Sequence, residues 1–159
     1  MSVRGRSLVE GSPRFFRRFS TLIYDQQDLK NEAEALAQFA CDAAGFYGFD
    51  LAQLVALGIS NGANIALTSL TLHPDPDAFN GAVLLRPVMA LEHPPKANLQ
   101  GFPVLVVHGR QDPFLPRAEP VTPYLHQSGA EVREVMLDKG HKLSGQDEIV
   151  VARWLRELA

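Results

Sequence analysis

Residues 54–62 of the chain are Leu54-Val55-Ala56-Leu57-Gly58-Ile59-Ser60-Asn61-Gly62. The unbroken apolar run from Leu54 to Ile59 predicts a buried strand, and the segment Ala63–Leu72 that follows has the composition of a helix. The stretch therefore predicts a strand, a sharp turn and a helix. Its spacing Gly58-x-Ser60-x-Gly62 is typical of a turn that holds a nucleophilic serine between a strand and a helix.

The segments on either side of this stretch alternate in the same way. Apolar residues recur every three or four positions between Asp28 and Ala44, which predicts a helix with one buried face. Largely apolar segments at Ala82–Val88 and Val104–Val107 predict strands buried on both faces, as in a parallel sheet covered by helices. A further strand is predicted at Val132–Leu137 and an amphipathic helix at Asp147–Leu158. The pattern predicts a single doubly wound α/β domain over residues 1–159.

Length and composition are those of an ordinary globular domain. The 159 residues are 46% hydrophobic and 21% charged, and a chain of this size can bury a core without disulfides or metals. The formal charge of -3 gives no electrostatic reason to bind nucleic acid. The longest apolar runs are about five residues, far short of the roughly 18 that a membrane span needs. We expect no nucleic-acid partner and no stable membrane insertion.

The chain has one cysteine, Cys41, which excludes an intramolecular disulfide and a cysteine-based metal cluster. Scarce cysteine is typical of a reducing compartment, so we expect a cytoplasmic protein without a metal site. Cys41 falls within the predicted helix Asp28–Ala44. A small cysteine there is more often part of the core than a nucleophile, and we expect a structural role.

The first 18 residues carry five arginines against one acid, Glu10. An arginine-rich start with few acids occurs in organellar transit peptides. The alternative is a solvated loop followed by a short helix, with phenylalanines turned inward and arginines outward. The residues concerned are Phe15, Phe16, Phe19, Arg14, Arg17 and Arg18.

A serine hydroxyl is a weak nucleophile at neutral pH, so a reactive Ser60 needs a histidine base and an acid that orients it. Among the five histidines, His141 follows a predicted strand and a glycine, which is the expected place for such a base. The other histidines are expected to be structural or exposed in loops; they are His73, His93, His108 and His126.

Two aspartates compete for the role of the acid. Asp112 comes just after the strand Val104–Val107, at the carboxyl edge of the sheet, where the turn at Ser60 also lies. Asp138 is close to His141 in the sequence and is better explained as an ordinary turn residue. We favour Asp112 and keep Asp138 as the alternative.

The sequence resembles the phospholipase/carboxylesterase group of α/β-hydrolases, serine esterases related to acyl-protein thioesterases. The similarity is carried by residues 57–66 around Ser60, by residues 108–113 with Pro116, and by residues 140–143. The basic segment 4–18 also resembles a loop of that group, which places this segment inside the domain. The resemblance implies an α/β-hydrolase fold, with a mostly parallel sheet and helices on both faces.

The resemblance also implies a function and a set of site residues. It implies a serine hydrolase of the carboxylesterase or lysophospholipase kind, with Ser60 as nucleophile, Asp112 as orienting acid and His141 as general base. The expected substrate is a small-molecule ester, and no cofactor is required. The backbone N–H of Asn61 is the expected oxyanion donor, and Phe114 and Leu115 are candidates to line the pocket. The segments Pro13–Phe19 and Leu91–Gln100 are candidates for its rim.

The sequence departs from the group at its start. Members begin with a strand and a glycine-rich loop whose backbone N–H supplies half of the oxyanion hole, and no such segment lies between Met1 and Ser60. We therefore expect an N-terminally incomplete domain, in which the lost donor costs about 10²- to 10³-fold in turnover. The alternative function is that of a catalytically impaired homologue acting as a binding or interaction module.

The same departure has a structural consequence. In the group's strand order the early strand lies beside the strand Leu54–Ile59, whose edge would otherwise be apolar and unpaired. Such an edge favours pairing with another chain or aggregation. We expect a homo-oligomer formed through this edge, or poor solubility.

Overall fold

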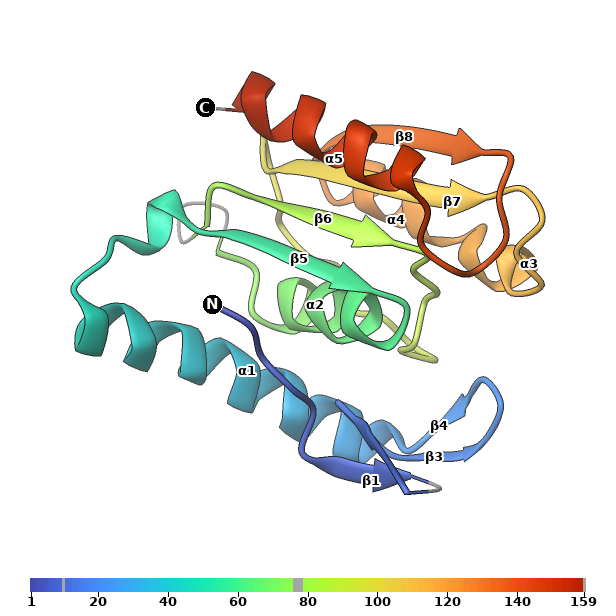
Figure 1. The fold of residues 1–159 in the computed structure, drawn as a ribbon. Helices are drawn as coiled ribbons and strands as arrows, with labels where there is room; N and C mark the ends of the chain where they lie inside the picture. Colours follow the sequence, from blue (N-terminus) through green and yellow to red (C-terminus); the bar gives the residue numbers. More distant parts are fainter. Residues whose placement is uncertain (10, 76–78, 159) are drawn as a thin grey trace.

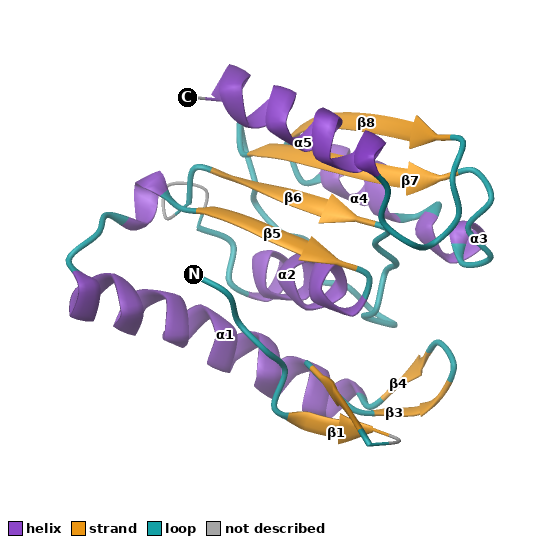
Figure 2. Cartoon of the chain, viewed as in Figure 1, coloured by secondary structure: helices purple, strands orange, loops and turns teal. Residues whose placement is uncertain are grey.

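The computed structural model describes residues 1–9, 11–75 and 79–158. Its centre is a parallel sheet of four strands with helices on both faces (Figures 1 and 2), which confirms the predicted architecture. In chain order the elements are β1 Ser7–Val9, β2 Ser12–Arg14, β3 Arg18–Ser20, β4 Ile23–Tyr24, α1 Gln26–Tyr47, the 3₁₀ turn Leu51–Gln53, β5 Val55–Ile59, α2 Asn61–Leu72, β6 Gly81–Leu85, β7 Pro103–Gly109, α3 Leu115–Ala118, α4 Val121–Gln127, β8 Glu131–Leu137 and α5 Gly145–Leu158.

The sheet has the strand order β5-β6-β7-β8, and neighbouring strands are parallel throughout. Side chains of α2 and α4 pack on one face of β6 and β7, while Val151 and Trp154 of α5 pack on the other. Helix α1 packs against α2 (Figure 1). Among the described helices, none is long and apolar enough to cross a membrane. Because the strands are parallel, their carboxyl ends form a single edge to which the later loops contribute.

Helix α1 is longer than predicted, and its buried face differs in one respect. Asp25 caps the helix, since its carboxylate accepts the N–H of Asp28, and Gly48 ends it in the left-handed conformation. Leu29, Ala33, Ala40 and Ala43 are buried. The expected core position of Cys41 is wrong: its side chain is exposed, because it falls just outside the stripe that contacts the domain.

The basic segment at the start of the chain forms two hairpins, β1-β2 and β3-β4, rather than the expected loop and short helix. Phe16 is buried against α1 and α2, but Phe19 is exposed. Two of the arginines expected to face solvent, Arg14 and Arg18, instead line a cavity of the domain. Arg14 ends β2 and Arg18 begins β3, so the bend between the two hairpins brings both side chains to the cavity together with Phe16.

Of the two glycines in the turn after β5, the backbone geometry requires only Gly58. A Cβ on Gly58 would lie 2.4 Å from the backbone carbonyl carbon of Gly62 and 2.6 Å from the N of Ala63, so the strand and the helix pass too closely for any side chain. A Cβ on Gly62 would make only an ordinary contact, 3.6 Å from the Phe15 ring. The close approach thus depends on Gly58, and Gly62 tolerates a methyl group.

A buried ion pair holds the loops at the carboxyl edge of the sheet. Arg86 follows β6 and its side chain is 0% exposed; its guanidinium donates to Asp147 of α5 over 2.8 and 3.2 Å. Nε of Arg86 donates to the carbonyl of Gly140 over 2.9 Å, and Nη1 donates to that of Val107. One side chain therefore connects β7, the loop before His141 and the start of α5.

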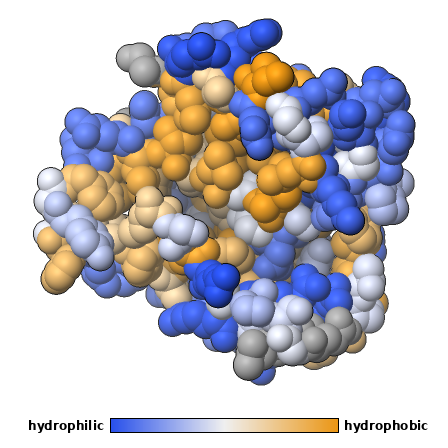
Figure 3. All heavy atoms as spheres, in the orientation of Figure 1, coloured by the Kyte–Doolittle hydropathy of each residue, from blue (hydrophilic) through white to orange (hydrophobic). Residues whose placement is uncertain are grey.

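Strand β5 lies at an edge of the sheet. Within the described residues it pairs only with β6, and Leu57 and Ile59 are 57% and 37% exposed. Apolar side chains gather at the centre of this face of the molecule (Figure 3), where Figure 1 places β5. The homo-oligomer expected from the sequence remains a prediction, and this edge is its proposed interface.

We predict that Gly58→Ala destabilises the protein by about 3 kcal/mol or more, because the methyl group meets backbone that can move only by opening the turn. Gly62→Ala is the matched control, with an expected change below about 1 kcal/mol. Urea unfolding followed by circular dichroism measures both. Equal losses for the two variants would contradict the packing described for the turn.

Asp147→Asn should cost about 3–5 kcal/mol at pH 7, because it leaves the Arg86 guanidinium buried without a counter-charge. Burial raises the pKa of Asp147, but hydrogen bonds from Arg86 and Ser144 outweigh burial and hold the pKa below 3.8. The carboxylate therefore stabilises the fold fully above pH 3.8, and this contribution is lost as the pH falls through the lowered pKa.

The difference in unfolding free energy between the wild type and Asp147→Asn is expected to be smaller at pH 3 than at pH 7. Glu157→Gln is the control, since it breaks the exposed Arg133–Glu157 pair and should cost below about 1 kcal/mol. A difference that stays constant over this pH range would overturn the role given to Asp147.

We predict that the chain sediments as a species larger than its 17.5 kDa monomer at micromolar concentration, and that Leu57→Lys shifts it to the monomer. A lysine at the edge of a sheet opposes strand pairing. Ile149→Lys is the control, since Ile149 is an equally exposed apolar residue on α5. Sedimentation velocity of the three proteins tests this, and a monomeric wild type would refute it.

Candidate active site

Three side chains from separate loops meet at the carboxyl edge of the sheet. Oγ of Ser60 lies 2.8 Å from Nε2 of His141, and Nδ1 of the same ring lies 2.8 Å from Oδ2 of Asp112. The structure thus brings together the three residues that the sequence singled out, although 81 positions separate the serine from the histidine. A serine hydroxyl can be activated when it contacts an imidazole that in turn contacts a carboxylate, and these three side chains have that arrangement.

Ser60 occupies a strained backbone position between β5 and α2. Its φ of 50° and ψ of -114° are rare for a residue with a side chain. Its N–H donates to the carbonyl of Leu85 over 2.8 Å, which ties the turn to the end of β6. Asn61 is the first residue of α2, so its N–H has no acceptor within the helix and lies beside the serine.

Asp112 is held from both sides in the turn after β7. Its side chain is 4% exposed; Oδ1 accepts the N–H of Phe114 over 2.9 Å, while Oδ2 faces His141. The alternative acid is outside this arrangement, because Asp138 accepts instead from the side-chain amide of Gln111. The carboxylate that faces the imidazole is therefore that of Asp112.

His141 is set by the loop that follows β8. A Cβ on Gly109 would lie 2.5 Å from the carbonyls of Lys139 and Gly140, so this glycine is what allows the loop to approach the end of β7. The Phe114 ring meets the imidazole edge to face, with centroids 5.0 Å apart. Leu115, the other candidate to line the pocket, begins α3 and is not among the residues that line the cavity.

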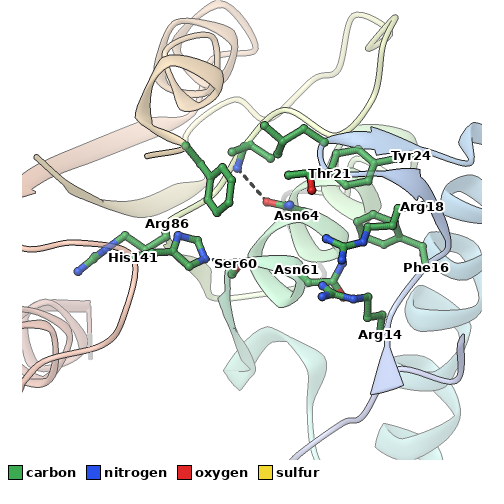
Figure 4. Close-up of a pocket in the computed structure, with 13 residues that line it drawn as sticks. Arg14, Phe16, Arg18, Thr21, Tyr24, Ser60, Asn61, Asn64, Arg86 and His141 are labelled. Atoms are coloured by element: carbon green, nitrogen blue, oxygen red, sulfur yellow. Dashed lines mark hydrogen bonds between the residues drawn. The ribbon is translucent and has the colours of Figure 1, made fainter. Parts of the chain in front are cut away.

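Ser60 and His141 open into a cavity of about 280 Å³ (Figure 4). Its lining comes from the turn at Ser60, from the loops after β6 and β7, and from the N-terminal hairpins. Arg86 and Asn64 are among the lining residues that the sequence did not point to. Asn64 is buried and its Oδ1 accepts the N–H of Val88 over 2.8 Å. A polar residue on the buried face of a predicted helix was the available signal for it.

His108, which lies near the same edge, has surroundings that indicate a structural role. His108 is buried in β7 and lies 3.1 Å from a carboxylate oxygen of Glu134. Burial lowers its pKa, against the opposing effect of Glu134. Among the described residues, no group of three or more His, Cys, Asp or Glu side chains is placed to hold a metal ion.

No model of a known protein family matches the chain, but individual proteins do. MhqD of Bacillus subtilis (strain 168), a predicted hydrolase, is 34% identical over 159 residues, which span 99% of this chain and 78% of MhqD. The carboxylesterase of Bacillus cereus is 36% identical, with a TM-score of 0.88 over 98% of this chain and 74% of that one. A carboxylesterase from Mesorhizobium loti is 33% identical, with a TM-score of 0.91 over 96% and 73%.

The likeness to these proteins extends over nearly the whole chain and includes every element that positions the site. Identity above 30% with hydrolases, together with their fold, goes beyond a shared architecture. The α/β-hydrolase fold expected from the sequence is thereby confirmed, as is a hydrolase function. The chain belongs to the phospholipase/carboxylesterase group of α/β-hydrolases.

Proposed function

We propose that this protein is a serine hydrolase that cleaves small carboxylic esters. The observation that supports this most directly is the continuous row from Ser60 through His141 to Asp112, with both links at 2.8 Å. The names of the relatives agree with it, since two of them are carboxylesterases. Ser60 is the proposed nucleophile, His141 the general base and Asp112 the residue that orients the imidazole.

In the first step Oγ of Ser60 attacks the ester carbonyl carbon, and Nε2 of His141 takes the hydroxyl proton. Asp112 favours this by keeping the other ring proton on Nδ1 and by stabilising the imidazolium. The imidazolium then gives its proton to the leaving alkoxide as the ester C–O bond breaks. The products of this half are an alcohol and an acyl group on Ser60.

In the second step a water molecule attacks the acyl-enzyme. His141 accepts the proton of the water and returns it to Oγ of Ser60 as the carboxylic acid leaves. The negative oxygen formed in each half needs backbone donors. The N–H of Asn61 is the proposed donor, because it has no acceptor within α2 and belongs to the residue that follows the nucleophile.

The cavity favours a short acyl or alcohol group over a long chain. Its volume of about 280 Å³ lies just below the range of pockets that enclose drug-sized ligands. A short ester therefore matches the space inside the cavity better than a lysophospholipid does.

We predict that a fluorophosphonate probe labels the wild-type protein at Ser60 and that the protein hydrolyses p-nitrophenyl acetate. Ser60→Ala should lose both signals. Asp112→Asn should lower kcat by about 10⁴-fold. Its oxygen stays with the N–H of Phe114, so the amide NH2 faces Nδ1 of His141 and donates to it, which favours the wrong tautomer of the ring. Mass spectrometry of the labelled peptide and steady-state kinetics measure these effects.

Asp138→Asn is the matched control, since Asp138 lies in the same loop as His141 but bonds only Gln111 among the described residues. We expect its kcat to stay within about twofold of wild type. Folded protein that neither labels nor hydrolyses the ester would refute the proposal and favour a binding or interaction module instead. A larger loss for Asp138→Asn than for Asp112→Asn would refute the assignment of the acid.

A further inference from the structure

Arg14 places a cation in the wall of the active-site cavity. It ends β2, lines the cavity together with Ser60 and Asn61, and points into it from the side opposite His141 (Figure 4). Its Nε is buried and has no hydrogen-bond partner among the described residues. The Arg14 guanidinium thus carries a charge and a buried donor without a described acceptor.

The other arginines of this region show that the situation of Arg14 is specific. Arg17 pairs with the carboxylates of Asp25 and Asp28, and Arg6 pairs with Glu32. Arg86, the third arginine at the cavity, is neutralised by Asp147. Arg14 has no such carboxylate among the described residues, and none of the described residues that line its cavity is acidic.

A second guanidinium adds to the positive wall. Arg18 lines the same cavity, and its guanidinium lies beside that of Arg14 (Figure 4). Tyr24 lies on the same wall. Burial raises the pKa of its hydroxyl, while the charges of Arg18, Arg117 and Arg14 lower it. The hairpins β1-β2 and β3-β4 therefore present positive charge toward the position of a substrate bound at Ser60.

An unpaired donor in a buried position costs free energy that an acceptor from outside the chain can recover. A guanidinium prefers an acceptor with two oxygens in one plane or on one phosphorus atom, which it can bond with two N–H groups. Water from bulk solvent supplies oxygens but no opposing charge. The group that best complements Arg14 is thus a carboxylate or a phosphate.

We propose that the substrates of this enzyme are short esters that carry an anionic group, a carboxylate or a phosphate, and that Arg14 binds this group while the ester carbonyl lies at Ser60. The inference rests on the proposed esterase function and adds the class of substrate. The anionic group is close to the carbonyl, because Arg14 and Ser60 line one cavity of about 280 Å³. Arg14 is a specificity residue here and takes no part in proton transfer.

The test compares three p-nitrophenyl esters of similar length. The glutarate monoester carries a carboxylate, the 3-phosphonopropionate carries a phosphonate, and the valerate is neutral. We expect kcat/KM for at least one anionic ester to exceed that for the valerate by about tenfold or more. The anionic ester that shows the larger preference identifies which of the two groups the site takes.

Substitutions at Arg14 then assign the preference to this side chain. Arg14→Gln should reduce the ratio of kcat/KM between the anionic and the neutral ester to about one, mainly through KM. Arg14→Lys keeps the charge but loses the paired N–H groups, so an intermediate ratio is expected. Arg153→Gln, at an exposed position of α5, is the control and should leave the ratio unchanged.

Binding of free glutarate by calorimetry gives a readout that needs no turnover. Wild type should bind glutarate at least tenfold more tightly than Arg14→Gln does, and neither protein should bind glutaramide. If kcat/KM of the wild type for the valerate equals or exceeds its kcat/KM for both anionic esters, the anion site is refuted and the esterase proposal stays intact. If glutarate binds in an Arg14-dependent way but no ester is hydrolysed, the esterase proposal is refuted and the anion site is supported.

Discussion

The buried pair of Arg86 and Asp147 is the interaction on which the arrangement of the carboxyl edge depends. Arg86 follows β6 with an unusual φ of 53°, and its guanidinium bonds Asp147, Gly140 and Val107. Asp147 in turn accepts the backbone N–H and the hydroxyl of Ser144. The loop that carries His141 is thereby held at both of its ends. Replacing a buried ion pair by apolar residues is often neutral for stability, so we infer that this pair serves to hold one arrangement of the segments it joins.

The geometry of the candidate active site follows from this frame and from two close backbone contacts. At Gly58 the strand and the helix approach until no Cβ fits, which presents Ser60 at the end of the sheet. At Gly109 the end of β7 admits the loop of Lys139 and Gly140 in the same way. Three loops that lie far apart along the chain therefore place their side chains within hydrogen-bond distance of one another. Neither the serine nor the histidine needs to move for the proton transfers proposed above.

The N-terminal hairpins contain the basic segment of the chain, and their arginines have two different surroundings. Some of their arginines neutralise acids at the start of α1, so part of the basic excess serves to attach the hairpins to the domain. The asparagine beside the nucleophile adds a second attachment, since the side chain of Asn61 accepts the N–H of Phe15 over 2.8 Å. Arg14 and Arg18 also line the cavity. A segment that resembles an ordinary basic tail in composition thus becomes the wall that would select the substrate.

The sequence alone determined the order of the central elements α1, β5, α2, β6, β7, β8 and α5, because short apolar runs bounded by turn residues predict buried strands and a period of three to four predicts helices. It did not predict the short helices α3 and α4. It also pointed to Ser60, Asp112 and His141 as side chains of one edge, since each follows a predicted strand, and the structure brings these three side chains together. It did not determine the conformation of residues 7–24, the exposure of Cys41 or the partner of Arg86. These depend on contacts between segments far apart in the chain, such as Arg86 with Asp147 and Phe15 with Asn61. Periodicity indicates which face of an element is buried, whereas only the tertiary structure decides which side chain or which cavity lies opposite that face.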